Sequence, residues 1–562
     1  VYLETNGTLP GALAELLAEG WELWRRLSVR RFLSLAELQQ QELLQQVRAA
    51  GLSPVALAQA VATFRDRRQF YDYARYRAAQ RQLEAFFALL SALHYPTRVT
   101  PADYPSARQL GSWAAIWTHL ERRFNPYLAF YEEVLFPQIA AALPVVIGLS
   151  VVFGPQLVQA LVLARRLKER FPQIHLTLGG AYLSQWLLLL DDEQLDLLST
   201  WVDSFILGEG EEAFATLLTR LAAGQDLTGV PNLIYRDRSS GRLHRCQTLT
   251  YPDITHLPPP DFSDLDLTAY LSPQPVIPYA ISRGCYWGRC VFCQNRYGDQ
   301  QLRRYQTVPV AKALAEIGEL LRRHQTDQVN FSNDAIDPGY LKHFSREVLA
   351  SGLKFFWHTD LRAEAAFDQE FCRLLAAAGL RSVAIGLESA CQRILDAMQK
   401  GTRIRTVRQV LKWLYEAGVA TQVMGIFGFP GETEAEGRLT VKFIEDNLDR
   451  ISYYVMGLLL VLPGSRLYRE PEAFGITEIS YADNPLRLPE PVWRSPRRMS
   501  PAAVQRLYQR LSRLEEIYEL NDYPYVGALS TNHSFLYFTQ GPDILKKLRR
   551  EVSAAQQQVA PR

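Results

Sequence analysis

Strand-like apolar runs alternate with amphipathic helical stretches from residue 144 to about residue 462, and this alternation constrains the fold most. The run PVVIGLSVV at 144–152 is apolar throughout, as expected for a parallel strand buried on both faces. A helical pattern separates it from further strands at 175–180 and 204–214. This order predicts a doubly wound α/β domain whose ligands bind at the carboxyl ends of the strands.

Three cysteines lie close together in a second region of this kind. Cys285, Cys290 and Cys293 follow an apolar run at 275–281 that is predicted to be a strand. Three thiolates at this spacing can hold three irons of a 4Fe–4S cluster and leave the fourth iron open. A structural zinc site normally needs four ligands, and a disulfide would leave one cysteine over, so these are the weaker alternatives.

The strand–helix alternation continues after the cysteines. Further strands are predicted at 328–334, 354–360, 382–389, 421–429 and 452–462. Six βα units predict a three-quarter TIM barrel, (β/α)6, with its chemistry at the carboxyl ends of the strands. Thr433 and Glu436 are spaced as a capping box for the helix after the fifth strand.

The segment RGC-x4-C-x-F-C resembles the cysteine motif of the radical S-adenosylmethionine (SAM) superfamily. The usual spacing there is C-x3-C-x2-C, and the first gap of this chain is one residue longer. GLES at 386–389, Met398-x-Lys400-Gly401 and GFPGET at 428–433 match the arrangement in cobalamin-type and related members. The resemblance implies a 4Fe–4S cluster on the three cysteines and SAM as a second cofactor.

The resemblance also implies SAM contacts by Phe292, Asn333, Asp334, Arg362 and Glu388. Phe292 matches the position near the adenine, and Glu388 the position that holds the ribose or amino group. Arg362 could pair with the SAM carboxylate, because arginine favours bidentate carboxylates. Asn333 and Asp334 fall at the family's second-strand motif, although its usual Gly-Gly-Glu form is absent. Arg362 and Asp360 could instead form a salt bridge at a strand end.

The ordered motifs GLS, LGG and GEGEE resemble the cobalamin-binding domain that precedes the barrel in one radical SAM subfamily. The resemblance implies a Rossmann-like fold in which the nucleotide tail of cobalamin lies beside Leu149, Ser150, Gly179, Gly180, Gly208 and Glu209. No D-x-H-x-x-G motif is present, so no histidine is nominated as a lower cobalt ligand. The first strands of such a domain are expected upstream of Val1, with residues 11–135 inserted as a helical excursion.

Proline-rich stretches and changes in sequence character predict how the chain divides into domains. The expected parts are a helical region at 1–135, the cobalamin-binding domain at 136–255, a proline-rich linker at 256–274, the barrel at 275–465 and an extension over the barrel mouth at 466–562. The extension carries a predicted helix at 501–520 and an aromatic tail with His533.

Net charge, apolar runs and cysteine count argue against several classes of protein. A net charge of +2 implies neither a nucleic-acid footprint nor a membrane-surface patch. No run approaches the roughly 18 apolar residues of a membrane span. Six cysteines in 562 residues do not make a disulfide scaffold, and a thiolate-held cluster suits a reducing cytoplasm.

The resemblance therefore implies a cobalamin-dependent radical SAM C-methyltransferase that acts on an unactivated carbon. A ribosomally made peptide or a small molecule is the expected substrate, and a flavodoxin- or ferredoxin-like protein the expected electron donor. One alternative is a cobalamin-binding radical SAM enzyme that catalyses a rearrangement or ring contraction. A non-catalytic iron–sulfur or cobalamin sensor is the alternative from another class.

Overall fold

The computed structural model describes residues 9–30, 32–100, 103–237, 240–246, 248–294, 305–481, 486–516 and 541–543. The predicted aromatic tail around His533 lies outside these residues. The chain forms two compact units, Val1–Pro252 with Tyr481–Pro491 and Asp253–Ser480 with Val492–Arg562. Each unit is described by itself.

The first unit begins with helices, as predicted. They are α2 (Leu9–Ser28), α3 (Leu35–Ala50), α4 (Pro54–Arg65), α5 (Arg67–Phe70) and α6 (Tyr73–Leu93), then the shorter α7 (Ala107–Leu110), α8 (Trp113–Thr118), η1 (Arg122–Phe124), α9 (Tyr127–Phe130), η2 (Tyr131–Leu135) and α10 (Phe136–Ala142). A Ser34 capping box starts α3, and Gly51 ends it at φ 61°. The three-and-four spacing of apolar residues buries Leu13, Leu44 and Val47 in a shared core.

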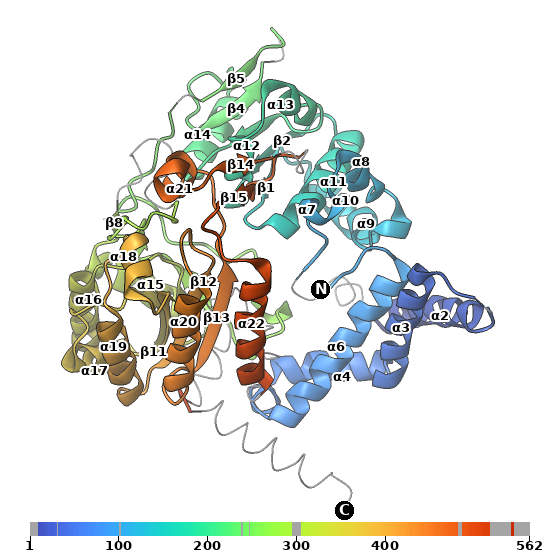
Figure 1. The fold of residues 1–562 in the computed structure, drawn as a ribbon. Coiled ribbons are helices and arrows are strands. Elements are labelled where there is room, and N and C mark those ends of the chain that lie inside the picture. The colour runs from blue at the N-terminus through green and yellow to red at the C-terminus, as the bar shows by residue number, and fades with distance from the viewer. Residues whose placement is uncertain are drawn as a thin grey trace, which may run out of the picture. The chain divides into compact units, whose positions relative to one another are not determined.

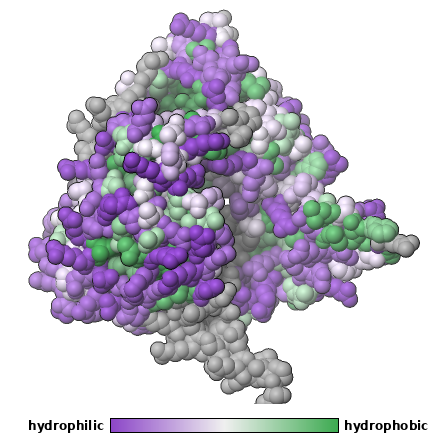
Figure 2. All heavy atoms as spheres, viewed as in Figure 1, coloured by the Kyte–Doolittle hydropathy of each residue, from purple (hydrophilic) through white to green (hydrophobic). Residues whose placement is uncertain are grey.

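Large apolar side chains are exposed where α2 meets α3. Val29, Phe32 and Leu35 are 73–83% exposed, and Figure 2 shows the corresponding green patch on this part of the surface. Within the described ranges, no single helix has the length and apolar character of a membrane span, although the bent pair of α3 and α4 meets both criteria together.

The sheet of the first unit has five strands in sequence order: β1 (Val146–Ser150), β2 (His175–Gly179), β3 (Ser204–Ile206), β4 (Leu233–Arg236) and β5 (Leu243–Arg245). The first three are parallel, and the last two add an antiparallel hairpin. The helices that follow the parallel strands are α11 (Gly154–Arg170), α12 (Ala181–Leu187), α13 (Asp192–Leu198) and α14 (Glu211–Ala222). The predicted strand–helix alternation is confirmed.

The second unit contains a fully parallel sheet of six strands: β6 (Ile277–Tyr279), β9 (Gln328–Phe331), β10 (Phe356–Leu361), β11 (Leu380–Glu388), β12 (Ala420–Phe427) and β13 (Tyr453–Leu458). Its helices are α15 (Val310–His324), α16 (Pro338–Ser351), α17 (Gln369–Ala377), α18 (Gln392–Ala397), α19 (Ile404–Glu416) and α20 (Glu434–Asp446). Figure 1 shows α16, α17, α19 and α20 outside the strands. Trp357, Val383 and Ile385 pack toward these helices in one core. All six predicted strands are present, while their closure into a partial barrel stays a prediction.

Short elements complete the second unit: η3 (Leu267–Ala269), the pair β7 (Ser282–Arg283) and β8 (Gln306–Thr307), α21 (Arg466–Arg469), η4 (Pro471–Phe474), the pair β14 (Glu478–Ser480) and β15 (Val492–Arg494), and α22 (Pro501–Glu516). The stretch between β14 and β15 belongs to the first unit. There Leu486 and Leu488 are 1% exposed, and the indole nitrogen of Trp186 donates to the Leu486 carbonyl over 2.7 Å.

Candidate active site

The cysteine loop (residues 284–294) follows β7 and is fastened to the turn after α18. The Val291 amide donates to the Met398 carbonyl over 3.0 Å. The Trp287 indole nitrogen donates to the Gln399 carbonyl over 2.9 Å. These two hydrogen bonds hold the loop against the turn at 398–401, which directly follows α18.

The three predicted ligand cysteines are half-buried thiols in this loop. Burial raises the pKa of Cys290, and the positive charge of Lys400 opposes that rise. Cys285 also lies within electrostatic range of Cys290. Among the described residues, no group of three or more His, Cys, Asp or Glu side chains converges on a single ion. A 4Fe–4S cluster binds its thiolates at separate irons, so this loop's soft donor set fits such a cluster.

Glu388 and Lys400 form a buried ion pair at the end of β11. Their charged atoms are 2.7 Å apart, and the side chains are only 13% and 11% exposed. Glu388 has φ 60°, and the β11–β12 register shifts beside it. Gly386 leaves room for the pair, because a Cβ there would lie 2.5 Å from Glu388 Oε1 and 2.7 Å from Lys400 Nζ. Burial lowers the pKa of Lys400, but the charges of Glu388 and Cys290 outweigh it and raise that pKa overall.

Arg362 links this pair to the cysteine loop. Its Nε and Nη2 each donate to the Lys400 carbonyl over 3.1 Å, and its guanidinium lies 3.8 Å from the ring centre of Trp287. Its ion-pair partner is Glu364, not Asp360 as the salt-bridge alternative supposed. Gly401 has φ 70°, and a Cβ there would lie 2.2 Å from Trp287. Arg362 is thus enclosed between the loop and the turn.

The other residues predicted to contact SAM occupy different environments. Asn333 donates from Nδ2 to Ser282 Oγ over 2.9 Å, so its amide supports the strand that enters the cysteine loop. Phe292 packs in an apolar cluster with Met398 and Phe429. Asp334 is half-buried beside Asn333. The structure therefore brings Arg362 and Glu388 together near Cys290, while contacts of all five residues with SAM stay predictions.

Lys400 is the residue for which no role was predicted. The motif Met398-x-Lys400-Gly401 was visible in the sequence, but nothing in it indicated that α18 returns this lysine to Glu388, twelve positions earlier. A lysine placed soon after a glutamate at a strand end is the signal that was available. Because Lys400 is buried, its ammonium requires an anionic partner.

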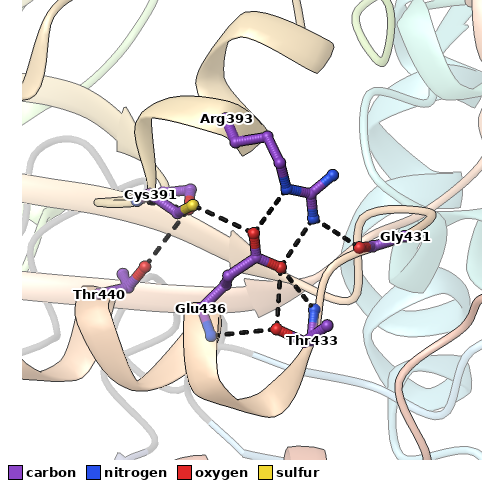
Figure 3. A network of polar contacts seen from close by, with 7 residues as sticks. Cys391, Arg393, Gly431, Thr433, Glu436 and Thr440 are labelled. Atoms are coloured by element: carbon purple, nitrogen blue, oxygen red, sulfur yellow. Dashed lines mark hydrogen bonds and ion pairs between the residues drawn. The ribbon is translucent and has the colours of Figure 1, made fainter.

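A second polar network supports the GFPGET turn (Figure 3). Arg393 donates to both carboxylate oxygens of Glu436 over 2.6 and 2.7 Å and to the Gly431 carbonyl over 2.7 Å. Glu436 also completes the capping box with Thr433, which confirms that prediction. Within the turn, burial raises the pKa of Glu432 to about 7, although its carboxylate accepts from the Gly428 amide over 2.7 Å.

The strand ends of the first unit are built differently, from backbone and small side chains. Ser150 lies opposite Gly179 in the sheet. Gly180 has φ 108°, and a Cβ there would lie 2.5 Å from the Val151 carbonyl oxygen. Ser184 Oγ donates to the Gly180 carbonyl over 2.8 Å and accepts from the Gly208 amide over 3.0 Å. The LGG and GEGE turns are thereby joined.

This edge, here called the glycine edge, comprises the residues predicted to lie beside cobalamin: Leu149, Ser150, Gly179, Gly180, Gly208 and Glu209. Ser150 is exposed and the others are half-buried. Small residues at this edge let a large ligand approach the backbone closely. The residues present fit such a ligand, and their contacts with cobalamin stay predictions.

Comparison with known proteins bears on both units. Residues 279–444 match the radical SAM superfamily. This segment is a radical SAM domain. A 4Fe–4S cluster and SAM are the cofactors of that superfamily, so the resemblance drawn from the cysteine loop is confirmed. A methyltransferase of Pyrococcus horikoshii whose function is uncharacterised is 26% identical over 48% of this chain and 57% of its own length.

Two solved structures resemble most of the chain. OxsB, a cobalamin-dependent SAM radical enzyme seen with aqua-cobalamin and SAM, has a TM-score of 0.55 at 15% identity, over 76% of this chain and 74% of its own. TsrM, a radical SAM methyltransferase of Kitasatospora setae seen with cobalamin and a [4Fe–4S] cluster, has a TM-score of 0.54 at 18% identity, over 76% and 93%. These likenesses confirm the α/β fold class. The chain spans about half the length of the curated relatives it matches.

Proposed function

We propose that this protein is a cobalamin-dependent radical SAM C-methyltransferase that acts on an unactivated carbon. The observation that carries the proposal is the buried cluster of Glu388, Lys400 and Arg362 beside Cys290. It places the Glu388 carboxylate and the Lys400 ammonium next to the thiols that would hold the iron–sulfur cluster, while Arg362 pairs with Glu364. SAM carries both an ammonium and a carboxylate, so this edge complements its methionine end.

Each side chain has a distinct part in this proposal. Glu388 would accept from the SAM ammonium, and Lys400 would bind its carboxylate. Arg362, predicted from the sequence to pair with the SAM carboxylate, would instead position Lys400 through the Lys400 carbonyl. The glycine edge of the first unit would receive the nucleotide tail of cobalamin. When bound, the cluster and SAM would supply a 5′-deoxyadenosyl radical that removes hydrogen from the substrate, and cobalamin would carry the methyl group.

Support for cobalamin comes from the fold, which resembles two enzymes seen with cobalamin over about three quarters of this chain. A ribosomally made peptide or a small molecule is the proposed substrate, and a flavodoxin- or ferredoxin-like protein the proposed electron donor. A cytoplasmic location would keep the thiols reduced.

Anaerobic purification followed by metal analysis and absorption spectroscopy tests the proposal. We expect iron and a corrin in the same protein, and, with SAM, reductant and substrate, one S-adenosylhomocysteine for each methylated product. Iron and SAM cleavage without methylated product would favour the rearrangement alternative. Cofactors bound without any SAM cleavage would favour the sensor, and iron without a corrin would contradict the cobalamin assignment.

A further inference from the structure

Four buried polar atoms on strands β9, β10 and β12 of the second unit have no hydrogen-bond partner within the described part of the chain. They are Gln328 Oε1, Asn330 Oδ1, His358 Nε2 and Gln422 Nε2. Gln328, His358 and Gln422 are only 1–5% exposed. The interior of a parallel barrel is normally filled by branched apolar side chains, so a row of unpaired polar atoms needs a reason.

These side chains share one face of the sheet, here called the inner face. His358 lies between Asn330 and Ser382 in the strand register, and its Nδ1 is 2.7 Å from Ser382 Oγ. The alternate residues of β10 and β11, such as Trp357 and Val383, pack in the core on the opposite face. The inner face therefore carries the polar row, while the outer face packs into the apolar core.

The inner face leads to the cofactor edge. On it β11 presents only Ser382, Ala384 and Gly386, and above Gly386 lies the Glu388–Lys400 pair. Asp360 and Gln422 flank the small Ala384 in the register. The Asp360 side chain is 34% exposed and lies 3.8 Å from His358 Nε2. Solvent, and hence a ligand, reaches the polar row at Asp360.

We propose that Asp360, His358, Asn330 and Gln422 form the substrate-recognition site, and that this site takes a nitrogen-bearing aromatic group. The inference rests on the proposed function and names its substrate class. Asp360 and Asn330 offer oxygens that accept from N–H groups, and the Gln422 amide nitrogen donates to an acceptor. The Asp360 carboxylate favours a cationic nitrogen over a carboxylate. Tyr453, which pairs with Gln422 in the register, adds an aromatic ring on the same face.

Calorimetric titration of the full chain, purified anaerobically, with two matched probes tests this site. Tryptamine carries an ammonium, and indole-3-propionate carries a carboxylate on the same ring. We expect tryptamine to bind at least about tenfold more tightly and Asp360→Asn to remove that preference, since the substitution deletes one charge. Asn330→Leu should weaken tryptamine severalfold, because it removes the buried oxygen that would accept from the indole N–H. Thr359→Val is the control, because Thr359 Oγ1 is also buried and has no partner among the described residues, but it lies on the outer face.

Equal affinity for the two probes, or no saturable binding of tryptamine, would overturn the site. So would a Thr359→Val effect as large as that of Asp360→Asn. Melting temperatures identify any variant that fails to fold, and Asn330→Leu then stands in for Asp360→Asn, with unchanged tryptamine affinity counting against the site. No SAM cleavage enters the titration. A protein that prefers tryptamine but never cleaves SAM would defeat only the proposed function, whereas methyl transfer without the preference would defeat only this site.

Discussion

The two units each present a ligand edge at the ends of parallel strands, but they build it from opposite materials. In the second unit the edge consists of paired charged side chains, Glu388 with Lys400 and Arg362 with Glu364. In the first unit the glycine edge consists of backbone, with Ser184 joining the Gly180 and Gly208 turns. The first kind complements a small ligand with ionic ends. The second suits a large ligand that must approach the main chain.

The two edges should also respond differently to mutation. Removing one member of a buried charge cluster leaves its partner unpaired, so the cost is large and depends on the partner. Changing a backbone-built edge acts through steric contact or through single hydrogen bonds, so each substitution should cost less. Substitutions on either side test this contrast.

The largest effect is expected from Cys290→Ser. A serine hydroxyl is a poor ligand for iron in place of a thiolate, so nearly all cluster iron should be lost. Iron per chain and the visible absorption spectrum measure this. The control is Cys246→Ser, which replaces a half-buried thiol of the first unit. The protein with this substitution should keep its full iron content. An unchanged iron content in the Cys290 variant would contradict the assignment of the cluster to the cysteine loop.

Lys400→Met should cost about 3–5 kcal/mol of unfolding free energy, because it leaves the Glu388 carboxylate buried without a counter-charge. Adding Glu388→Gln should recover much of that loss. The matched control is Lys412→Met, whose exposed pair with Glu416 is worth less than about 1 kcal/mol. Denaturant titration measures all three. Equal costs at Lys400 and Lys412 would show that the charged edge is not coupled.

Glu432→Gln separates charge from shape in the GFPGET turn. The pKa of this carboxyl is raised from 4.5 to about 7 by burial, so the folded state favours the protonated acid. Its contribution to stability is fully present below pH 4.5 and is lost as pH rises through 7. The variant should therefore match the parent at pH 4 and exceed its stability by up to roughly 3 kcal/mol at pH 8. Parallel stability–pH curves for the two proteins would contradict this.

Sequence patterns predicted the backbone of both edges well. Apolar residues and their spacing placed all six strands of the second unit, because each strand buries its outer face in one apolar core. The GLS and LGG motifs likewise fell at neighbouring strand ends. These features are local, so a single sequence carries them.

The side-chain pairings were harder to predict, because they depend on which segments far apart in the sequence lie side by side in the fold. Lys400 reaches Glu388 only through α18, and Arg362 binds a carbonyl rather than the neighbouring Asp360. Asn333 proved to hold Ser282, a contact that no spacing rule indicates. The glycine edge was easier to anticipate, since glycine reports a backbone requirement directly.

Gly180→Ala tests whether the glycine edge is limited by steric contact. An added Cβ would lie 2.5 Å from the Val151 carbonyl oxygen at a φ of 108°. We expect a loss of about 2 kcal/mol in unfolding free energy and a lower corrin content. Gly210→Ala is the control, because its Cβ would meet only Ile206 at 3.6 Å. If both variants behave alike, close backbone approach does not define this edge.

The smallest effect is expected from Ser184→Ala, which removes the bridge between the two glycine turns. The Gly208 amide would lose its acceptor, at a cost of about 1 kcal/mol. Ser199→Ala removes only a local bond to the Leu195 carbonyl and is the control. In the double variant with Gly180→Ala, we expect a coupling energy of at least about 0.5 kcal/mol in denaturant titration, because Ser184 Oγ donates to the Gly180 carbonyl. Losses that simply add would show that this bridge does not join the two turns energetically.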